Sequence, residues 1–95
     1  MRIVWTVPAA ADLDSIEAFI AEHDPQAALG VVRRIIGLVG RQLPRHPYSG
    51  RAGRVPGTRE LVVPDTPFIV AYRVEAGRLE VLRVLHAARR WPDRL

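Results

Sequence analysis

The stretch from Gly57 to Pro92 constrains the fold most, because it reads as three consecutive β-strands. Three runs, 58–63, 68–74 and 79–85, are rich in β-branched and other apolar residues. Turn-forming residues separate them, Asp65-Thr66-Pro67 in one gap and Glu75-Ala76-Gly77 in the other. Strands joined by such short turns pair with their neighbours, so the sequence predicts an antiparallel meander.

A two-residue turn at Ala76-Gly77 sets the predicted register of the last two strands. It places Arg73 opposite Glu80, where an ion pair would support that register. The further pairs predicted from this turn are Tyr72 with Val81, Ala71 with Leu82, Val70 with Arg83 and Ile69 with Val84. Both faces of the sheet are then largely apolar, so both must be covered. Arg83 is the charged exception in its row, which calls for a partner or a substrate.

Two helices are predicted before the meander, after a short strand at Arg2–Trp5. Thr6 suits an N-cap, and apolar residues at helical spacing give the first helix one buried side over about four turns. These apolar residues are Ala9, Leu13, Ile16 and Ile20. Asp24-Pro25 closes that helix and opens a second one that runs to about Leu43. The second helix carries two apolar rows, a wider stripe than a surface helix needs.

The predicted order β-α-α-β-β-β defines an α+β fold, an antiparallel sheet with an N-terminal helical hairpin packed on one face. At 95 residues, without a linker or an internal repeat, the chain is expected to form one domain over residues 1–95. Residues 43–56 are rich in proline, glycine and arginine, which predicts a loop. No predicted element covers the second face of the sheet. We therefore expect that face to stay open, apolar and cationic, for another macromolecule.

All 14 basic residues are arginine, and they are unevenly distributed. Residues 1–32 hold one arginine against five acids, residues 33–59 hold seven arginines and no acid, and residues 60–95 hold six arginines against five acids. The net charge of +4 therefore conceals a segment of +7. Such a block usually meets nucleic acid or an acidic protein. Arginine makes forked contacts with phosphate or carboxylate and cannot serve as a base.

Several kinds of site lack the residues they need. Without cysteine there is no disulfide, thiolate nucleophile or zinc–thiolate site. The histidines at 23, 46 and 86 lack the spacing that prearranges metal ligands, and no glycine-rich phosphate loop is present. We therefore expect no metal and no cofactor. No signal peptide and no apolar run of roughly 18 residues is found, so the expected location is the cytoplasm, without membrane contact.

The segments Gly57–Leu61, Ile69–Val74 and Leu82–His86 carry the clearest family resemblance. Together with Trp91-Pro92 and segments of both helices, they resemble the RelE/ParE superfamily of toxins from type II toxin-antitoxin modules over nearly the whole chain. The resemblance implies a small toxin in a hetero-oligomer with its antitoxin. That partner would be a ParD-like or similar protein whose disordered, acidic segment folds as it binds.

The branches of this superfamily differ in target. The chain is more similar to the ParE-like branch through Gly57–Val63, Ile69–Val74 and the absence of lysine. A ParE-like toxin of the plasmid-stabilisation type inhibits DNA gyrase by binding and not by catalysis. A RelE-like toxin is a metal-independent endoribonuclease that cleaves mRNA on the ribosome. The remaining alternative is a non-toxic, arginine-rich binding module that has kept only the fold.

Candidate site residues follow from these alternatives. RNA cleavage needs a base, an acid and cations around the phosphate, and a RelE-like activity would use Arg83, His86 and Arg59. Arg83 and His86 are an odd number of residues apart, so a regular strand turns them to opposite faces unless a bulge intervenes. The residues expected to bind the target or the antitoxin are Arg51, Arg54, Arg59, Tyr72, Arg73, Arg83, Arg89, Arg90 and Trp91. The structural alternatives are a solvated or antitoxin-binding loop, a core-edge ion pair for Arg83 and a polar strand end for His86.

Overall fold

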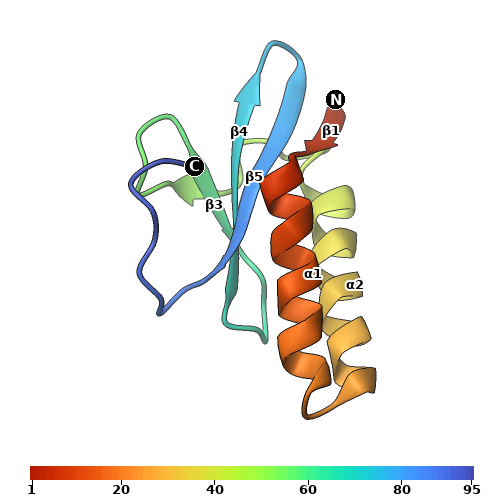
Figure 1. Cartoon of the computed structure of the whole chain (residues 1–95). Coiled ribbons are helices and arrows are strands. Elements are labelled where there is room, and N and C mark those ends of the chain that lie inside the picture. The colour runs from red at the N-terminus through yellow and green to blue at the C-terminus, as the bar shows by residue number, and fades with distance from the viewer.

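A five-stranded sheet with two helices on one face forms the framework of the protein (Figure 1). The computed structural model describes all 95 residues, Met1–Leu95. Its elements are β1 (Arg2–Trp5), α1 (Val7–Ala21), α2 (Pro25–Gln42), β2 (Arg51–Ala52), β3 (Arg59–Val62), β4 (Phe68–Glu75) and β5 (Arg78–His86). The strands lie in the order β1-β5-β4-β3-β2. The predicted α+β fold with its N-terminal helical hairpin is confirmed.

Two features of the sheet go beyond that prediction. β1 pairs in parallel with β5, so the sheet is mixed and not antiparallel throughout. The loop after α2 contains the two-residue strand β2, which pairs antiparallel with β3. Because β1 lies beside the last strand, the first residues of the chain and the end of the meander share one edge of the sheet.

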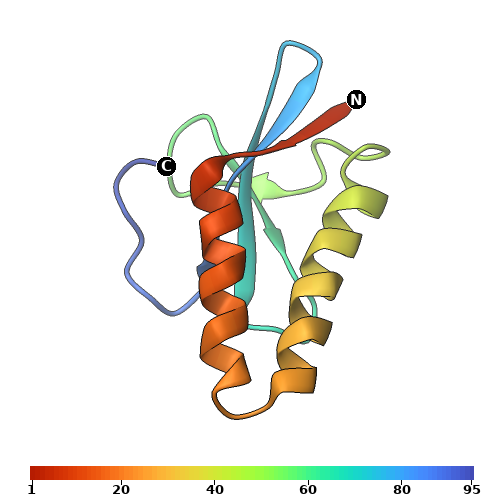
Figure 2. The same ribbon diagram turned by 45° about the vertical axis from the view of Figure 1, so that its right-hand side comes forward.

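Local capping places both helices where the sequence predicts them. α1 follows Thr6, whose Oγ1 accepts a hydrogen bond from Ala9 N at 3.2 Å. α2 follows Asp24, whose Oδ1 accepts from Ala27 N at 3.1 Å. The helices form an antiparallel pair (Figure 2), and neither has the length and apolarity that crossing a bilayer requires. The core is made of Ala9, Leu13, Ile16, Ile35, Val39, Leu43, Leu61, Val63, Phe68, Val70, Tyr72, Leu79, Val81 and Val84.

The register of β4 against β5 agrees with the prediction near the turn and differs beyond it. Arg73 pairs with Glu80 and Tyr72 with Val81. A β-bulge then leaves Leu82 without a partner, so the predicted pairs of Leu82, Arg83 and Val84 are wrong. The observed pairs are Ala71 with Arg83, Val70 with Val84 and Ile69 with Leu85.

The bulge lies where β1 gives way to α1. Thr6 donates there to two successive carbonyls of β5, from its backbone N to Val81 O at 3.1 Å and from Oγ1 to Leu82 O at 3.0 Å. The extra residue of the bulge lets both carbonyls face the same neighbour. As a consequence, Arg83 leaves the row that faces the core, while Val84 enters it.

The C-terminal tail, residues 87–95, lies on the side of the sheet away from the helices (Figure 1). It is fastened by Trp91, whose Nε1 donates to His86 O at 3.0 Å and whose ring lies 3.8 Å from the Arg54 guanidinium carbon. Ile69 and Ala71, on this second face of the sheet, are buried. The expectation that the whole face stays open is therefore wrong, because these residues are buried and the tail of the same chain lies on that side (Figure 1).

Candidate functional site

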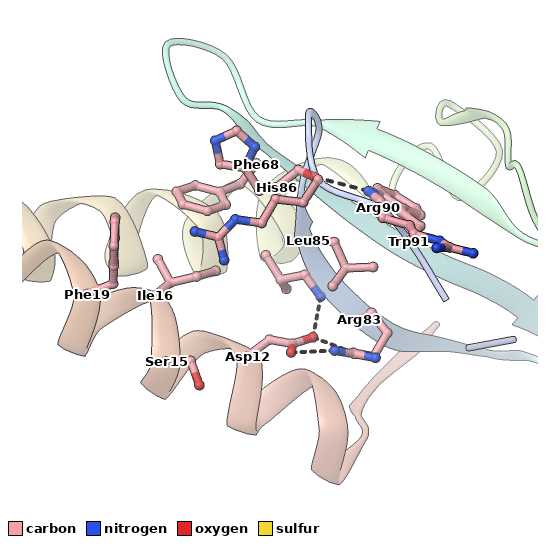
Figure 3. A pocket seen from close by; sticks show the side chains of 12 residues that line it. Asp12, Ser15, Ile16, Phe19, Phe68, Arg83, Leu85, His86, Arg90 and Trp91 are labelled. Carbon is pink, nitrogen blue, oxygen red and sulfur yellow. Dashed lines mark hydrogen bonds and ion pairs between the residues drawn. The ribbon is translucent and has the colours of Figure 1, made fainter. Parts of the chain in front are cut away.

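A groove of about 390 Å³ lies between α1, the end of β5 and the C-terminal tail (Figure 3). We call it the α1–β5 groove. Its lining consists of Asp12, Ser15, Ile16, Phe19, Phe68, Arg83, Val84, Leu85, His86, Arg89, Arg90 and Trp91. It follows the part of β5 that extends beyond the last residue paired with β1. The groove combines apolar walls with charged groups, so it suits a ligand that has both characters.

An ion pair between Asp12 and Arg83 closes one end of the groove (Figure 3). Arg83 donates from Nε to Asp12 Oδ2 at 2.7 Å and from Nη2 to Oδ1 at 2.9 Å. The same Oδ2 accepts from Val84 N at 2.9 Å, which satisfies a backbone donor that no strand reaches. Hydrogen bonding to Asp12 raises the pKa of Arg83 above its usual value. Arg83 is therefore held by its own chain, in the core-edge ion pair that the sequence left open.

Arg83 and His86 still point to opposite sides of β5, because the bulge precedes both of them. They meet in one groove only because the groove runs along the strand's edge. His86 Nδ1 accepts a hydrogen bond from Ala88 N at 3.1 Å, and the ring packs edge-on against Phe68 at 5.8 Å between centroids. A neutral ring held this way carries its proton on Nε2, so it offers a donor and not a free basic nitrogen.

The two arginines of the predicted binding loop share one buried carboxylate. Glu60 is 3% exposed, and its Oε1 lies 3.1 Å from Arg51 Nη2. Its Oε2 accepts from Arg54 N at 2.8 Å and lies 3.5 Å from Arg54 Nε. A buried carboxylate requires such partners, so Arg51 and Arg54 are tied to the sheet by the needs of Glu60.

Arg59 and Tyr72 fasten the same loop through its backbone. Arg59 Nη1 donates to Tyr48 O at 3.1 Å and Gly50 O at 2.9 Å. The Tyr72 hydroxyl donates to Pro47 O at 2.9 Å and accepts from Gly50 N at 2.9 Å. Burial raises the pKa of the fully buried Tyr72. A Cβ at Gly50 would lie 2.6 Å from the Tyr72 oxygen, so this contact requires glycine.

Most of the arginines predicted to bind a partner thus have one inside the chain. Arg73 bonds Glu80 at 2.8 Å, while Arg89 lies 5.7 Å from the Phe19 ring. Arg89 and Arg90, both in the tail, are the predicted arginines without a carboxylate or carbonyl partner among the ion pairs and hydrogen bonds. The sequence analysis missed Asp12 and Glu60, since each is matched to arginines by the fold and not by a local motif. No three histidine, aspartate or glutamate side chains gather as a metal-ligand set.

Residues 3–91 match the sequence model of the family described as the ParE toxin of the type II toxin-antitoxin system parDE. A relative in Sinorhizobium fredii, named "Putative toxin Y4kP", is 47% identical over 92 residues, covering 97% of this chain and 94% of the relative. "Toxin RelE2" of Caulobacter vibrioides is 35% identical over 88 residues, covering 93% and 97%.

A solved structure, titled "Chromosomal ParDE TA system from P. aeruginosa", superimposes with a TM-score of 0.82 at 34% identity. The match covers 90% of this chain and 95% of that one. Sequence and fold thus agree over almost the whole length. The chain belongs to the ParE toxin family of type II toxin-antitoxin systems, within the RelE/ParE superfamily.

Proposed function

We propose that this toxin inhibits DNA gyrase by binding to it, without catalysis of its own, and that a cognate antitoxin neutralises it. The observation that carries the proposal is the internal engagement of each candidate catalytic side chain. Arg83 is held by Asp12, Arg59 by two backbone carbonyls, and His86 Nδ1 by Ala88 N.

Cleavage of RNA without a metal would need these groups to be available. The base must take the 2′-hydroxyl proton, and cations must face the phosphate as charge develops. A guanidinium that already spans a carboxylate has its Nε and one Nη occupied, and its charge is offset. The arrangement therefore favours a protein that binds its target over one that cleaves it.

The α1–β5 groove is the best candidate for the antitoxin site. Phe19 is 56% exposed at its rim, and Arg89 and Arg90 add charge that no carboxylate of the chain offsets. An amphipathic, acidic segment that folds as it binds would satisfy both, with apolar side chains in the groove and carboxylates on the arginines. The structural relative comes from a ParDE toxin-antitoxin system, which fits such a partner.

A RelE-like endoribonuclease remains the second candidate. Its support is the 35% identical relative named "Toxin RelE2", together with the presence of Arg83 and His86 in one groove. Binding of mRNA would then have to release Arg83 from Asp12 before the guanidinium could serve the phosphate.

The test is to induce the protein in bacteria without its antitoxin and measure two readouts. We expect gyrase–DNA cleavage complexes and a DNA-damage response, retained in His86→Gln, because binding to gyrase would need no proton transfer by His86. Messenger RNA cut in phase with codons, and no longer cut in His86→Gln or Arg83→Ala, would establish the endoribonuclease instead. Purified toxin with purified gyrase should reproduce the first outcome without other components.

A further inference from the structure

The outward side of α2 carries four arginines that no part of the chain neutralises. Arg33, Arg34 and Arg41 lie on the helix and Arg45 just beyond it, and all four are exposed. None of them takes part in an ion pair. We call this surface, with Gly37 and Gly40 between the arginines, the α2 outer face.

Gly37 allows one of these cations to lie closer to another. The Arg41 side chain folds back over Gly37, where an added Cβ would lie 2.6 Å from Arg41 Nη1. Gly37 is one helical turn after Arg33, so the Arg41 guanidinium lies within about a turn of that second cation. Along the axis, the eight-residue step from Arg33 to Arg41 spans about 12 Å at 1.5 Å per residue.

This arrangement weakens the helix that bears it. Each interior glycine costs roughly 1 kcal/mol relative to alanine, and like charges a turn apart are unfavourable by a few tenths of a kcal/mol. Nothing packs on Gly40, so close contact within the chain does not explain that residue. No acid occurs from residue 25 to residue 59 to relieve the repulsion. Local rules are commonly broken in this way where a surface serves binding.

The shape of the face favours a phosphate backbone. A shallow depression at its C-terminal end is lined by Gly40, Arg41, Pro44 and Arg45, without any apolar side chain other than the proline. Guanidinium groups bind phosphate oxygens through paired N–H donors. Gly40, which nothing in the chain covers, lets a bulky strand approach the helix closely. Leu29 and Ile36 are 43% and 45% exposed, and the helical period of 3.6 residues places them at the border of the face and not at its centre.

We propose that the α2 outer face binds the phosphate backbone of duplex DNA. The inference rests on the proposed function and deepens it, because gyrase works while holding a duplex. A toxin with affinity for both would be retained on the gyrase–DNA complex through the second contact. This surface is separate from the α1–β5 groove, so the antitoxin site and the DNA site use different side chains.

The test measures the fluorescence anisotropy of a labelled 20-base-pair duplex, titrated with purified toxin at several salt concentrations. The variant Arg33→Gln/Arg41→Gln/Arg45→Gln is compared with Arg2→Gln/Arg78→Gln/Arg94→Gln, which removes three exposed arginines elsewhere. The net charge is the same in both. We expect the α2 variant to lose more than tenfold in affinity at about 0.1 M salt, with a salt slope reduced by about 2 to 3, while the control changes little.

Equal losses in the two triple variants would overturn the proposal, because bulk charge would then explain the binding. Tighter binding to polyglutamate than to DNA would also overturn the proposal, if that binding is lost in Leu29→Gln/Ile36→Gln. The ligand of the α2 outer face would then be an acidic protein. The assay contains no gyrase, so its failure leaves gyrase inhibition untouched. Conversely, if the protein binds DNA but has no effect on gyrase, the proposed gyrase inhibition is wrong and the DNA-binding face remains.

Discussion

The arginines of the segment 51–59 and those of the α2 outer face come from one acid-free stretch of sequence but have opposite fates. In the loop, Arg51 and Arg54 pair with Glu60, and Arg59 holds two carbonyls. On α2, the arginines have neither kind of partner. The loop therefore uses its charge to fold, whereas α2 keeps its charge for something outside the chain.

The difference shows that a run of charge in a sequence does not measure the charge a surface offers. The counter-charges lie outside the run, at Glu60 in β3 and, for Arg83, at Asp12 in α1. A helix such as α2 points successive residues around its axis, so its outward side cannot reach the sheet's acids. A loop folded over a sheet edge can reach them.

The largest effect should follow from removing the carboxylate that holds Arg83. Asp12→Ala leaves a partly buried cation and Val84 N without partners, so we expect the free energy of unfolding to fall by about 2 to 3 kcal/mol. Denaturant unfolding measures this loss of free energy in Asp12→Ala. The control is Asp14→Ala, which removes an exposed acid from the same helix. In an Arg83→Met background Asp12→Ala should cost much less.

Equal stability of Asp12→Ala and Asp14→Ala would break the contrast at this point. Arg83 would then resemble the α2 arginines, as a cation available to bind a partner outside the chain. The Arg83→Met background separates the two contributions, since the loss that remains there reports only on the Val84 N hydrogen bond.

What the sequence could predict was set by neighbours along the chain. Helix starts at Thr6 and Asp24 follow from capping residues and proline, and the register near Ala76-Gly77 follows from a tight turn. The prediction went wrong at Leu82 because the bulge depends on Thr6, which is 76 residues away. A contact of that kind leaves no periodic trace in either segment.

The candidate site was predictable in its residue types and not in their roles. The motifs that resemble the toxin family indicated Arg83, His86 and the loop arginines, all of which lie at the groove or the loop. Their internal partners are a matter of tertiary placement, as with Asp12, which lies 71 residues before Arg83. That the α2 arginines lack ion-pair partners follows only from the fold, in which the carboxylates pair with other arginines.

A smaller effect should follow from freeing the loop at Tyr72. Tyr72→Phe leaves Gly50 N and Pro47 O without their hydroxyl partner, which should lower the free energy of unfolding by about 1 to 2 kcal/mol. Because burial raises the pKa of Tyr72, the folded state keeps its proton while the unfolded chain, with a pKa near 10, loses it. Stability should therefore be intact below pH 10 and fall as the pH rises above it.

Chemical unfolding between pH 8 and 11.5 measures that alkaline decline. It should disappear in Tyr72→Phe and persist in Tyr48→Phe, since Tyr48 is 63% exposed and its hydroxyl is not buried in the core. An unchanged decline in Tyr72→Phe would mean that another group causes it. The loop would then be fastened mainly by Glu60 and Arg59.

The smallest effect, and the most direct test of the α2 side, compares two glycines three residues apart. Gly40→Ala meets nothing within 4 Å and should stabilise the protein by about 0.5 to 1 kcal/mol. Gly37→Ala should stabilise it by a similar amount, but its Cβ would meet Arg41 Nη1 and push the guanidinium aside. Thermal unfolding should thus give both variants a higher melting temperature than the wild type. The affinity for duplex DNA, measured by anisotropy, should fall by about two- to threefold in Gly37→Ala alone. If both variants bind DNA equally well, the folded-back position of Arg41 is irrelevant to binding. The unpaired charge of the α2 arginines would then matter for DNA binding, but their arrangement on the helix would not.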